Sequence, residues 1–329
     1  MASEQFLTHY ESPDPKLWKG RPDGPRLYQH IQCVDLQKTP SLNAPSPAFA
    51  IIGFASDEGV KRNFGRLGAA LGPNVLRRAL APLPLHGHPT AAFVDLGNVH
   101  CQDGDLEGAQ AALEQIVATL SARQMTSIVL GGGHELAFAH FQGLVTAHPE
   151  KRIGVLNFDA HFDLRPLQDG LGTSGSPFFQ MHLAEAARHK TLDYTCIGIQ
   201  SVSNTTTLFE SAKTLGVNVV QAGAIERGDL EPALKTIREL VARNDAIYVS
   251  LCLDVFAECF APGVSAPCAL GLFPQQITPL IEEVVHSKKV IAFDIAELSP
   301  AHDIGGMTAR LAASMLHVFL EAWGTNRGG

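Results

Sequence analysis

Short apolar runs recur along the chain from residue 49 onward, and stretches with helical periodicity separate most of them. The runs that predict strands are 49–54, 91–94, 127–130, 153–158, 194–199, 217–220, 246–253 and 290–295. The periodic stretches that predict helices include 105–122, 139–147, 230–243, 275–286 and a closing helix over 307–323. A strand followed by a helix, repeated about eight times, predicts an α/β domain with a mostly parallel sheet and helices on both faces.

This alternation does not decide whether the sheet stays open or closes into a (β/α)₈ barrel. In both topologies, ligands bind at the carboxyl ends of the parallel strands. His134, Asp159, Asp254 and Glu297 each stand at or just after the end of an apolar run. The sequence therefore predicts where a functional site lies, whichever topology the sheet adopts.

Two parts of the chain differ in composition. Residues 1–46 are polar and interrupted by prolines, which predicts an N-terminal arm, whereas strand and helix patterns continue without a break over 47–329. With 329 residues, 45% of them hydrophobic, the chain is long enough to form one large core. We expect a single α/β domain over 47–329.

The charge balance argues against nucleic acid and membranes as partners. Asp and Glu number 33 against 25 Lys and Arg, so the net charge is −8, and no block of basic residues occurs. No secretion signal is recognisable at the start, and no apolar stretch approaches the roughly 20 residues that span a bilayer. The six cysteines lack CxxC pairing, so we expect a cytoplasmic protein with reduced thiols and no disulfides.

Three strong metal ligands follow the apolar run 153–158 at alternate positions: Asp159, His161 and Asp163. On extended backbone, residues spaced by two point to the same side, so these side chains leave one strand end together. Charged groups are normally excluded from a strand that is buried on both faces unless they are paired or bind a metal. The spacing therefore predicts a metal site.

Other strand ends supply ligands of the same kind. Cys252 and Asp254 stand two residues apart at the end of another apolar run, and a turn of three glycines delivers His134. Oxygen and imidazole donors suit a divalent hard or borderline metal, and shared carboxylates indicate two ions rather than one. A simpler interpretation, in which Asp159 and Asp163 cap a helix and the histidines are core residues, accounts poorly for so many such strings in one chain.

These strings, taken in order, resemble the ureohydrolase family of arginase and agmatinase, and most closely its formimidoylglutamase branch. The most specific segments are Asp159-Ala160-His161-Phe162-Asp163-Leu164-Arg165 and Ser174-Gly175-Ser176-Pro177-Phe178. Segments within 57–66, 198–204 and 261–267 point the same way. The resemblance implies a three-layer α/β/α fold on a mostly parallel sheet of about eight strands, two Mn²⁺ ions per subunit, and a homo-oligomer.

The resemblance also assigns roles to the matching positions. His134 and Asp163 would hold one metal, His161 and Asp254 the other, and Asp159 would bridge both. The family's second bridging aspartate falls on Cys252, and a thiolate is a softer ligand that suits zinc or iron better than manganese. Cys252 is therefore either a true ligand or a small buried residue beside a weakened site.

The implied reaction is hydrolysis of N-formimidoyl-L-glutamate to L-glutamate and formamide, a step of histidine degradation, by a hydroxide that bridges the metals. Glu297 would face the cationic amidine, and Asp163 would pass a proton to the leaving amine. Arg165, with Arg66 as second choice, is expected to bind the substrate's carboxylates, because a planar guanidinium matches a carboxylate. Weaker candidates for contacts with this small-molecule substrate are Asn63, Asn204 and Ser176.

Two alternative functions stay open at this point. A guanidino-hydrolase acting on agmatine, arginine or a guanidino acid would use the same metals and Glu297. The replacement at Cys252 also permits a metal-poor relative that binds a ligand or a partner without turnover.

Overall fold

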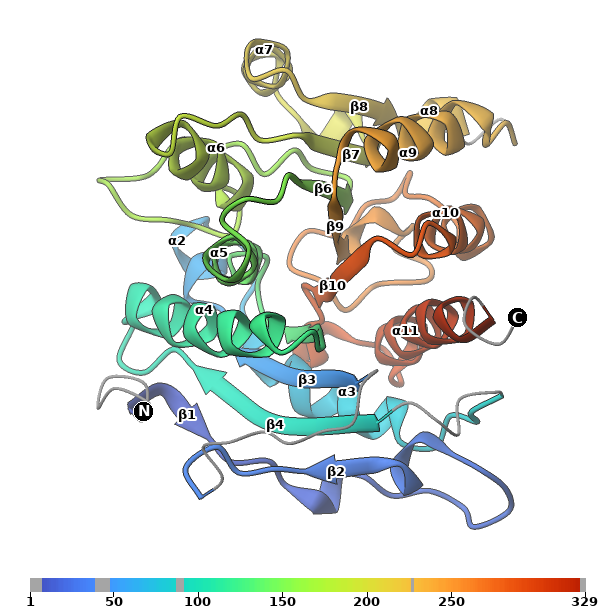
Figure 1. Cartoon of the computed structure of the whole chain (residues 1–329). Coiled ribbons are helices and arrows are strands. Elements are labelled where there is room, and N and C mark those ends of the chain that lie inside the picture. Colours follow the sequence, from blue (N-terminus) through green and yellow to red (C-terminus); the bar gives the residue numbers. More distant parts are fainter. Residues whose placement is uncertain (1–7, 39–47, 87–91, 226–227, 326–329) are drawn as a thin grey trace.

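A mostly parallel sheet lies between two layers of helices in the computed structural model, which describes residues 8–38, 48–86, 92–225 and 228–325 (Figure 1). The strands are β1 (Tyr10–Glu11), β2 (Ile31–Cys33), β3 (Ala48–Ala55), β4 (Ala92–His100), β5 (Thr126–Gly131), β6 (Ile153–Phe158), β7 (Tyr194–Ile199), β8 (Asn218–Gln221), β9 (Ala246–Cys252) and β10 (Val290–Ala296).

Helices cover both faces of this sheet, with α4, α5 and α6 on one side and α9, α10 and α11 on the other (Figure 1). They are α2 (Glu58–Arg62), α3 (Gly72–Leu80), α4 (Leu106–Ala122), α5 (Leu136–Ala147), α6 (Pro177–Ala187), α7 (Thr206–Thr214), α8 (Ala222–Ile225), α9 (Glu231–Arg243), α10 (Pro274–His286) and α11 (Met307–Thr325). In the described part of the chain, no helix combines the length and the apolar character needed to cross a membrane.

The sheet confirms the predicted strands and settles the topology. The apolar runs correspond to β3 through β10, and the periodic stretches correspond to α4, α5, α9, α10 and α11. Within the described residues the strand order is β1-β4-β3-β5-β10-β9-β6-β7-β8, and β2 also pairs with β4. Because β4 and β8 lie toward opposite ends of this order, the sheet is open and the barrel alternative is excluded.

The N-terminal segment contributes β1 and β2, which the apolar pattern did not predict. Both pair with β4, β1 antiparallel and β2 parallel. Trp18 of this segment donates its indole N–H to Asp95 of β4 at 2.7 Å. These strands are two and three residues long, too short to give a periodic signal. Residues 1–7 and 39–46 of the predicted arm lie outside the described residues.

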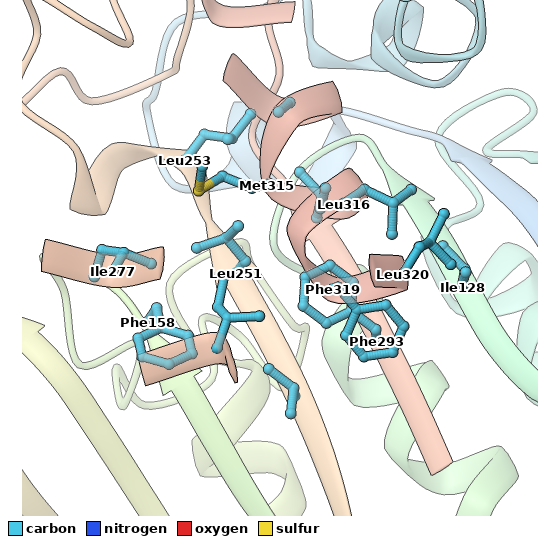
Figure 2. Close-up of a cluster of buried hydrophobic side chains, with 14 of the residues drawn as sticks. Ile128, Phe158, Leu251, Leu253, Ile277, Phe293, Met315, Leu316, Phe319 and Leu320 are labelled. Carbon is cyan, nitrogen blue, oxygen red and sulfur yellow. The ribbon is translucent and has the colours of Figure 1, made fainter. Parts of the chain in front are cut away.

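Two hydrophobic clusters fill the spaces between the sheet and its helices. Successive residues of a strand point to opposite faces, so neighbouring residues of β5 belong to different clusters. Figure 2 shows part of one cluster, in which Leu251 and Phe293 of the strands face Phe319 of α11. The rings of Phe293 and Phe319 stack with their centroids 4.4 Å apart. This packing fixes α11 against the central strands on one face of the sheet.

The centre of the sheet consists of β5, β10, β9 and β6, in that order. β5 and β6 follow each other along the chain but are separated in the sheet by β10 and β9, which come from the C-terminal third. These four strands are parallel, so their carboxyl ends lie at one edge. Residues that follow them are therefore brought together although they are far apart in the sequence.

Candidate metal centre

The connections after the central strands place the predicted ligands at one edge of the sheet. Asp159 directly follows β6, Cys252 ends β9, Asp254 lies in the 3₁₀ helix Leu253–Val255, and Glu297 directly follows β10. His134 follows β5 through the glycine turn. At Gly132 a Cβ would lie 2.2 Å from the carbonyl oxygen of Ser56, so only glycine lets this turn pack against the end of β3.

The donor atoms form two groups that share Asp159. Ligand atoms of His134, Asp159 and Cys252 lie within 4.8 Å of one another, and so do those of Asp159, His161 and Asp254. The carboxylate of Asp159 is completely buried, with Oδ2 3.1 Å from Nδ1 of His134 and Oδ1 3.5 Å from Nδ1 of His161. Two ligand groups around one shared carboxylate are the arrangement that a two-metal site requires.

Asp163 and Glu297 reach the centre from strained backbone. Their φ angles are +49° and +73°, in the left-handed region that non-glycine residues rarely adopt. Oδ2 of Asp163 lies 2.9 Å from Nδ1 of His134, and Oε1 of Glu297 accepts a hydrogen bond from the backbone N–H of His134 at 2.8 Å. Such strain persists where the surrounding structure enforces it, and it clusters at functional sites.

The donor set fits divalent cations. Among the described residues, Oδ1 of Asp254 and Oε2 of Glu297 are buried without a hydrogen-bond partner. Nδ1 of His134 lies close to two carboxylates but makes no well-directed hydrogen bond to either. Buried polar atoms without partners are rare, and buried carboxylates need a counter-charge. Buried oxygen and imidazole donors that converge without hydrogen-bond partners are suited to bind divalent metals.

Within the protein alone, protons balance the charge of this centre. Burial opposes ionisation of Asp159, but the nearby imidazoles of His134 and His161 outweigh it and lower its pKa below the usual range. Burial lowers the pKa of both histidines, but the surrounding carboxylates outweigh it and raise that pKa well above the ordinary value. Burial, together with the charge of Asp159, raises the pKa of Asp254 to about 6. A metal that binds here must displace protons.

Cys252 lies among these ligands rather than apart from them. Its Sγ belongs to the group with His134 and Asp159, and its side chain is only 1% exposed. Burial, and then the negative charge of Asp159, raises the pKa of the thiol well above its usual value. The sulfur therefore keeps its proton unless a metal replaces it.

A cavity of about 280 Å³ opens onto the centre. Its lining includes the centre residues His134, His161, Asp163, Cys252, Asp254 and Glu297, together with the predicted substrate contacts Asn63, Arg66, Arg165 and Asn204. Ser176 is outside this lining; its hydroxyl is buried and accepts a hydrogen bond from the backbone N–H of Thr173. Ser174, two residues earlier, lines the cavity instead.

The two arginines of the lining differ in how they are bonded. The guanidinium of Arg66 donates to the backbone carbonyls of Pro262, Val264 and Ser265, so it joins the loop after α2 to the loop after β9. Arg165 is exposed, and its guanidinium has no hydrogen bond or ion pair with any described residue. Arg165 is therefore available to bind an anion without first breaking a contact.

The two asparagines of the lining also serve the loops. Asn204 accepts from the backbone N–H of Phe162 and donates to the carbonyls of Ala160 and Gln200, which fixes the chain beside the ligand segment. Asn63 donates to the hydroxyl of Ser174 at 3.2 Å.

Two features of the centre escaped the sequence analysis. Glu135, completely buried beside His134, accepts hydrogen bonds from Ser56 and from the backbone N–H of Gly59, and so anchors the start of α2. Ser250 bonds to Nε2 of His134 and to Asp294. The available signal was a polar residue inside an otherwise apolar run, as Ser250 and Asp294 are in β9 and β10.

Comparison with known proteins agrees with this fold. A model of the arginase family matches residues 47–321, and the chain therefore belongs to the arginase family, as its ligand strings predicted. A formimidoylglutamase of Legionella pneumophila (strain Lens) is 44% identical over 319 residues, which cover 96% of this chain and 98% of that relative.

Solved structures show the same fold. Trypanosoma cruzi formiminoglutamase with Mn2+2 is 26% identical, with a TM-score of 0.79 over 92% of this chain and 99% of that one. Formimidoylglutamase from Bacillus subtilis subsp. subtilis str. 168 is 22% identical, with a TM-score of 0.81 over 94% of this chain and 95% of that one. The prediction of an arginase-like α/β fold is confirmed.

Proposed function

We propose that this chain is a metal-dependent hydrolase that converts N-formimidoyl-L-glutamate and water into L-glutamate and formamide, a step of histidine degradation. The observation that carries the proposal is one cavity that combines a converging ligand set with an unbonded arginine at its side. The first feature suits hydrolysis of an amidine, and the second suits a substrate with carboxylates. A formimidoylglutamase relative that is 44% identical over 96% of this chain supports the same substrate.

Two Mn²⁺ ions are the proposed cofactor. Asp159 would be shared, His134, Asp163 and Cys252 would hold one ion, and His161 and Asp254 the other. Bound divalent ions supply Lewis acidity, which lowers the pKa of water toward neutrality and so makes hydroxide available at physiological pH.

Glu297 would orient the amidine. Its carboxyl lies in the cavity lining, 2% exposed, and burial raises its pKa to about 7. A protonated amidine next to it favours the ionised carboxylate, so substrate and Glu297 form a charge-assisted pair that the buried site strengthens. The unpartnered Oε2 offers the acceptor for this bond. The amidine carbon is thereby held facing the ligand groups.

Asp163 would carry the proton of the reaction. When water adds to the amidine carbon, one proton must reach the nitrogen of the leaving glutamate before that carbon–nitrogen bond breaks. Asp163 lines the cavity beside His134, and burial, with the charge of Asp159, raises its pKa above the ordinary value. A carboxylate with a raised pKa accepts the proton more readily than an exposed aspartate does.

The glutamate end of the substrate would meet the arginines. Arg165 is the principal candidate because its guanidinium is unbonded, and Arg66, already tied to the loop after β9, offers a second positive charge. Asn63 and Asn204 border the same space, whereas Ser176 would act through the turn that presents Ser174.

The identity of the products tests this proposal. Purified protein loaded with Mn²⁺ should release formamide and glutamate in equal amounts from N-formimidoyl-L-glutamate. Release of urea from agmatine, arginine or a guanidino acid would instead support the guanidino-hydrolase. Folded, metal-loaded protein without activity on any of these compounds would support a non-catalytic binding relative.

The setting of this activity is also proposed. The net charge of −8 and the free cysteines suit a cytoplasmic enzyme of a small-molecule substrate, without nucleic acid or membrane as a partner. Residues 47–329 would form the catalytic domain, and the family resemblance favours a homo-oligomer.

A further inference from the structure

We propose that Asp294 is a positioning residue that acts through Ser250 to fix the ring nitrogen with which His134 meets a metal. The inference rests on the proposed metal-dependent function and deepens it. Asp294 lies within β10, is completely buried and is not part of the cavity lining. It therefore touches neither substrate nor metal, and any role in the reaction must pass through its neighbours.

The register of the sheet brings the three residues together. Asp294 of β10 pairs with Ser250 of β9 in the parallel ladder, and both side chains point to the face covered by α5. The hydroxyl of Ser250 donates to Oδ1 of Asp294 at 2.6 Å. The same oxygen of Ser250 lies 2.9 Å from Nε2 of His134.

The direction of these bonds determines the tautomer of His134. A serine hydroxyl has a single hydrogen, and Ser250 donates this hydrogen to Asp294. The Ser250 oxygen can therefore only accept a hydrogen bond from His134. Nε2 of His134 must then carry a hydrogen. In a neutral imidazole the other nitrogen, Nδ1, has the free lone pair, and Nδ1 is the atom that faces Asp159 and Asp163. Once a metal has displaced the proton of Nδ1, the hydrogen on Nε2 stays with Ser250 and Nδ1 remains the ligand.

The remaining contacts of Asp294 hold it in the acceptor role. Its Oδ2 accepts from the hydroxyl of Tyr248 and lies 2.7 Å from Nδ1 of His140. Burial, reinforced by Asp294, raises the pKa of the Tyr248 phenol well above its usual value, so this hydroxyl keeps its hydrogen. The Tyr248 hydroxyl thus occupies Oδ2, and Oδ1 is left to accept from Ser250.

An amide in place of the carboxylate removes this constraint. In Asp294→Asn the NH₂ group can face Ser250 and donate to it, and the serine hydroxyl can then turn and donate to Nε2 of His134. The hydrogen of a neutral ring would move to Nδ1 and compete with the metal. Ser250→Ala removes the acceptor of the Nε2 hydrogen and leaves the tautomer unspecified.

The test is a calorimetric titration of Mn²⁺ into metal-free wild type, Ser250→Ala and Asp294→Asn. In both variants the affinity for the more strongly affected of the two Mn²⁺ ions should fall by roughly 10- to 100-fold. This is the loss typical when a residue that hydrogen-bonds a metal-binding histidine is replaced. Ser121→Ala is the matched control, because Ser121 is also buried and also lies 2.9 Å from Nε2 of a histidine, His148, away from the centre. Its metal affinities should equal those of wild type.

A second measurement separates positioning from a merely structural role. ¹⁵N spectra of the histidine rings in Zn²⁺-loaded protein should show hydrogen on Nε2 of His134 in wild type and in Ser121→Ala. Asp294→Asn should lose or redistribute that signal. If Asp294→Asn does not fold, Ser250→Ala, which removes a single oxygen, decides the matter alone.

The outcomes distinguish this inference from the function on which it rests. Wild-type protein that binds two ions, together with a Ser250→Ala variant of unchanged affinity and an unchanged His134 signal, would overturn the positioning role only. Wild-type protein that binds no divalent metal would overturn the proposed function and this inference together.

Discussion

Asp159, Asp254 and Glu297 are carboxylic acids of one buried centre, yet their surroundings give them different protonation. Two neighbouring histidines lower the pKa of Asp159, whereas burial raises that of Asp254 to about 6 and that of Glu297 to about 7. Groups whose environments separate their pKa values in this way take different roles in a reaction. Asp159 is suited to remain an anion between two cations, and Glu297 to gain its charge when a cationic substrate arrives.

Arg165→Ala should raise KM for N-formimidoyl-L-glutamate much more than KM for a simple formamidine that lacks carboxylates. A hydrogen-bonded charge pair contributes about 1.5–3 kcal/mol, so we expect roughly a 10- to 150-fold increase for the first substrate. Steady-state kinetics on both substrates measure the ratio, with Arg78→Ala, an exposed arginine of α3 outside the cavity, as control. Equal effects on both substrates would remove Arg165 from the specificity role.

Glu135 gives a prediction about pH. Burial, together with the charge of Glu297, raises its pKa from 4.5 to about 8. Between these pH values the folded protein binds one more proton than the unfolded chain, so this group lowers the free energy of unfolding as pH rises, by about 1.4 kcal/mol per pH unit. Glu135→Gln keeps the neutral form, so its stability relative to wild type should improve from about pH 5 to about pH 8.

Chemical denaturation in the presence of a chelator measures this difference without the contribution of metals. Glu282→Gln, at an exposed position of α10, is the control and should show no such trend. A difference between Glu135→Gln and wild type that stays constant with pH would contradict a protonated Glu135.

Strands and helices can be predicted from the sequence when their own residues determine them, and not when distant residues do. Strands buried on both faces need uninterrupted apolar runs, so β3 to β10 were visible in the sequence, and so were the ligands at their ends. β1 and β2 form only because β4 offers an edge, which is information from distant residues. The contact between Ser250 and Asp294 depends on the register of β9 with β10, which a single sequence does not contain.

The loops around the cavity are held by side chains that sequence analysis assigned to the substrate. Arg66 is the clearest case, because its guanidinium binds three carbonyl groups of the loop after β9. Arg66→Ala should therefore increase hydrogen exchange of the backbone amides in 263–266 by about tenfold, since a hydrogen bond from a charged group contributes about 1.5 kcal/mol.

Mass spectrometry of exchanged peptides measures this effect. Arg165→Ala is the matched control, because Arg165 lines the same cavity but donates no bond to this loop. The same exchange in Arg66→Ala and wild type would show that other contacts hold the loop.

Over the whole molecule, a buried ion pair adds to the strand pairing that joins the described N-terminal segment to the sheet. Arg77 of α3 and Asp95 of β4 are 1% and 0% exposed, and Nη2 of Arg77 lies 2.8 Å from Oδ1 of Asp95. Trp18 donates to the same carboxylate, so the segment, α3 and β4 meet at this point. A deeply buried charge pair is stable only when its other hydrogen-bonding groups also have partners. Here Arg77 donates to the side chain of Asn98 and to the backbone carbonyl of Gly97.

Arg77→Ala should lower the free energy of unfolding by about 3–5 kcal/mol, because it leaves the carboxylate of Asp95 buried without its partner. Urea denaturation followed by the fluorescence of Trp18 and Trp323, the two tryptophans of the chain, measures the change. Arg78→Ala, at the next position of the same helix but exposed, should change stability by less than about 0.5 kcal/mol. Equal stability of the two variants would show that the pair does not fasten the segment.

The central claim is that side chains at the carboxyl ends of β5, β6 and β9 together bind two metal ions, which share Asp159 as a ligand. Its most direct test is the Mn²⁺ content of wild type and Asp159→Asn, measured by elemental analysis after equal loading and dialysis. We expect about two ions per chain in wild type and almost none in Asp159→Asn, because both ions lose a ligand at once. Equal metal content in the two proteins would contradict it.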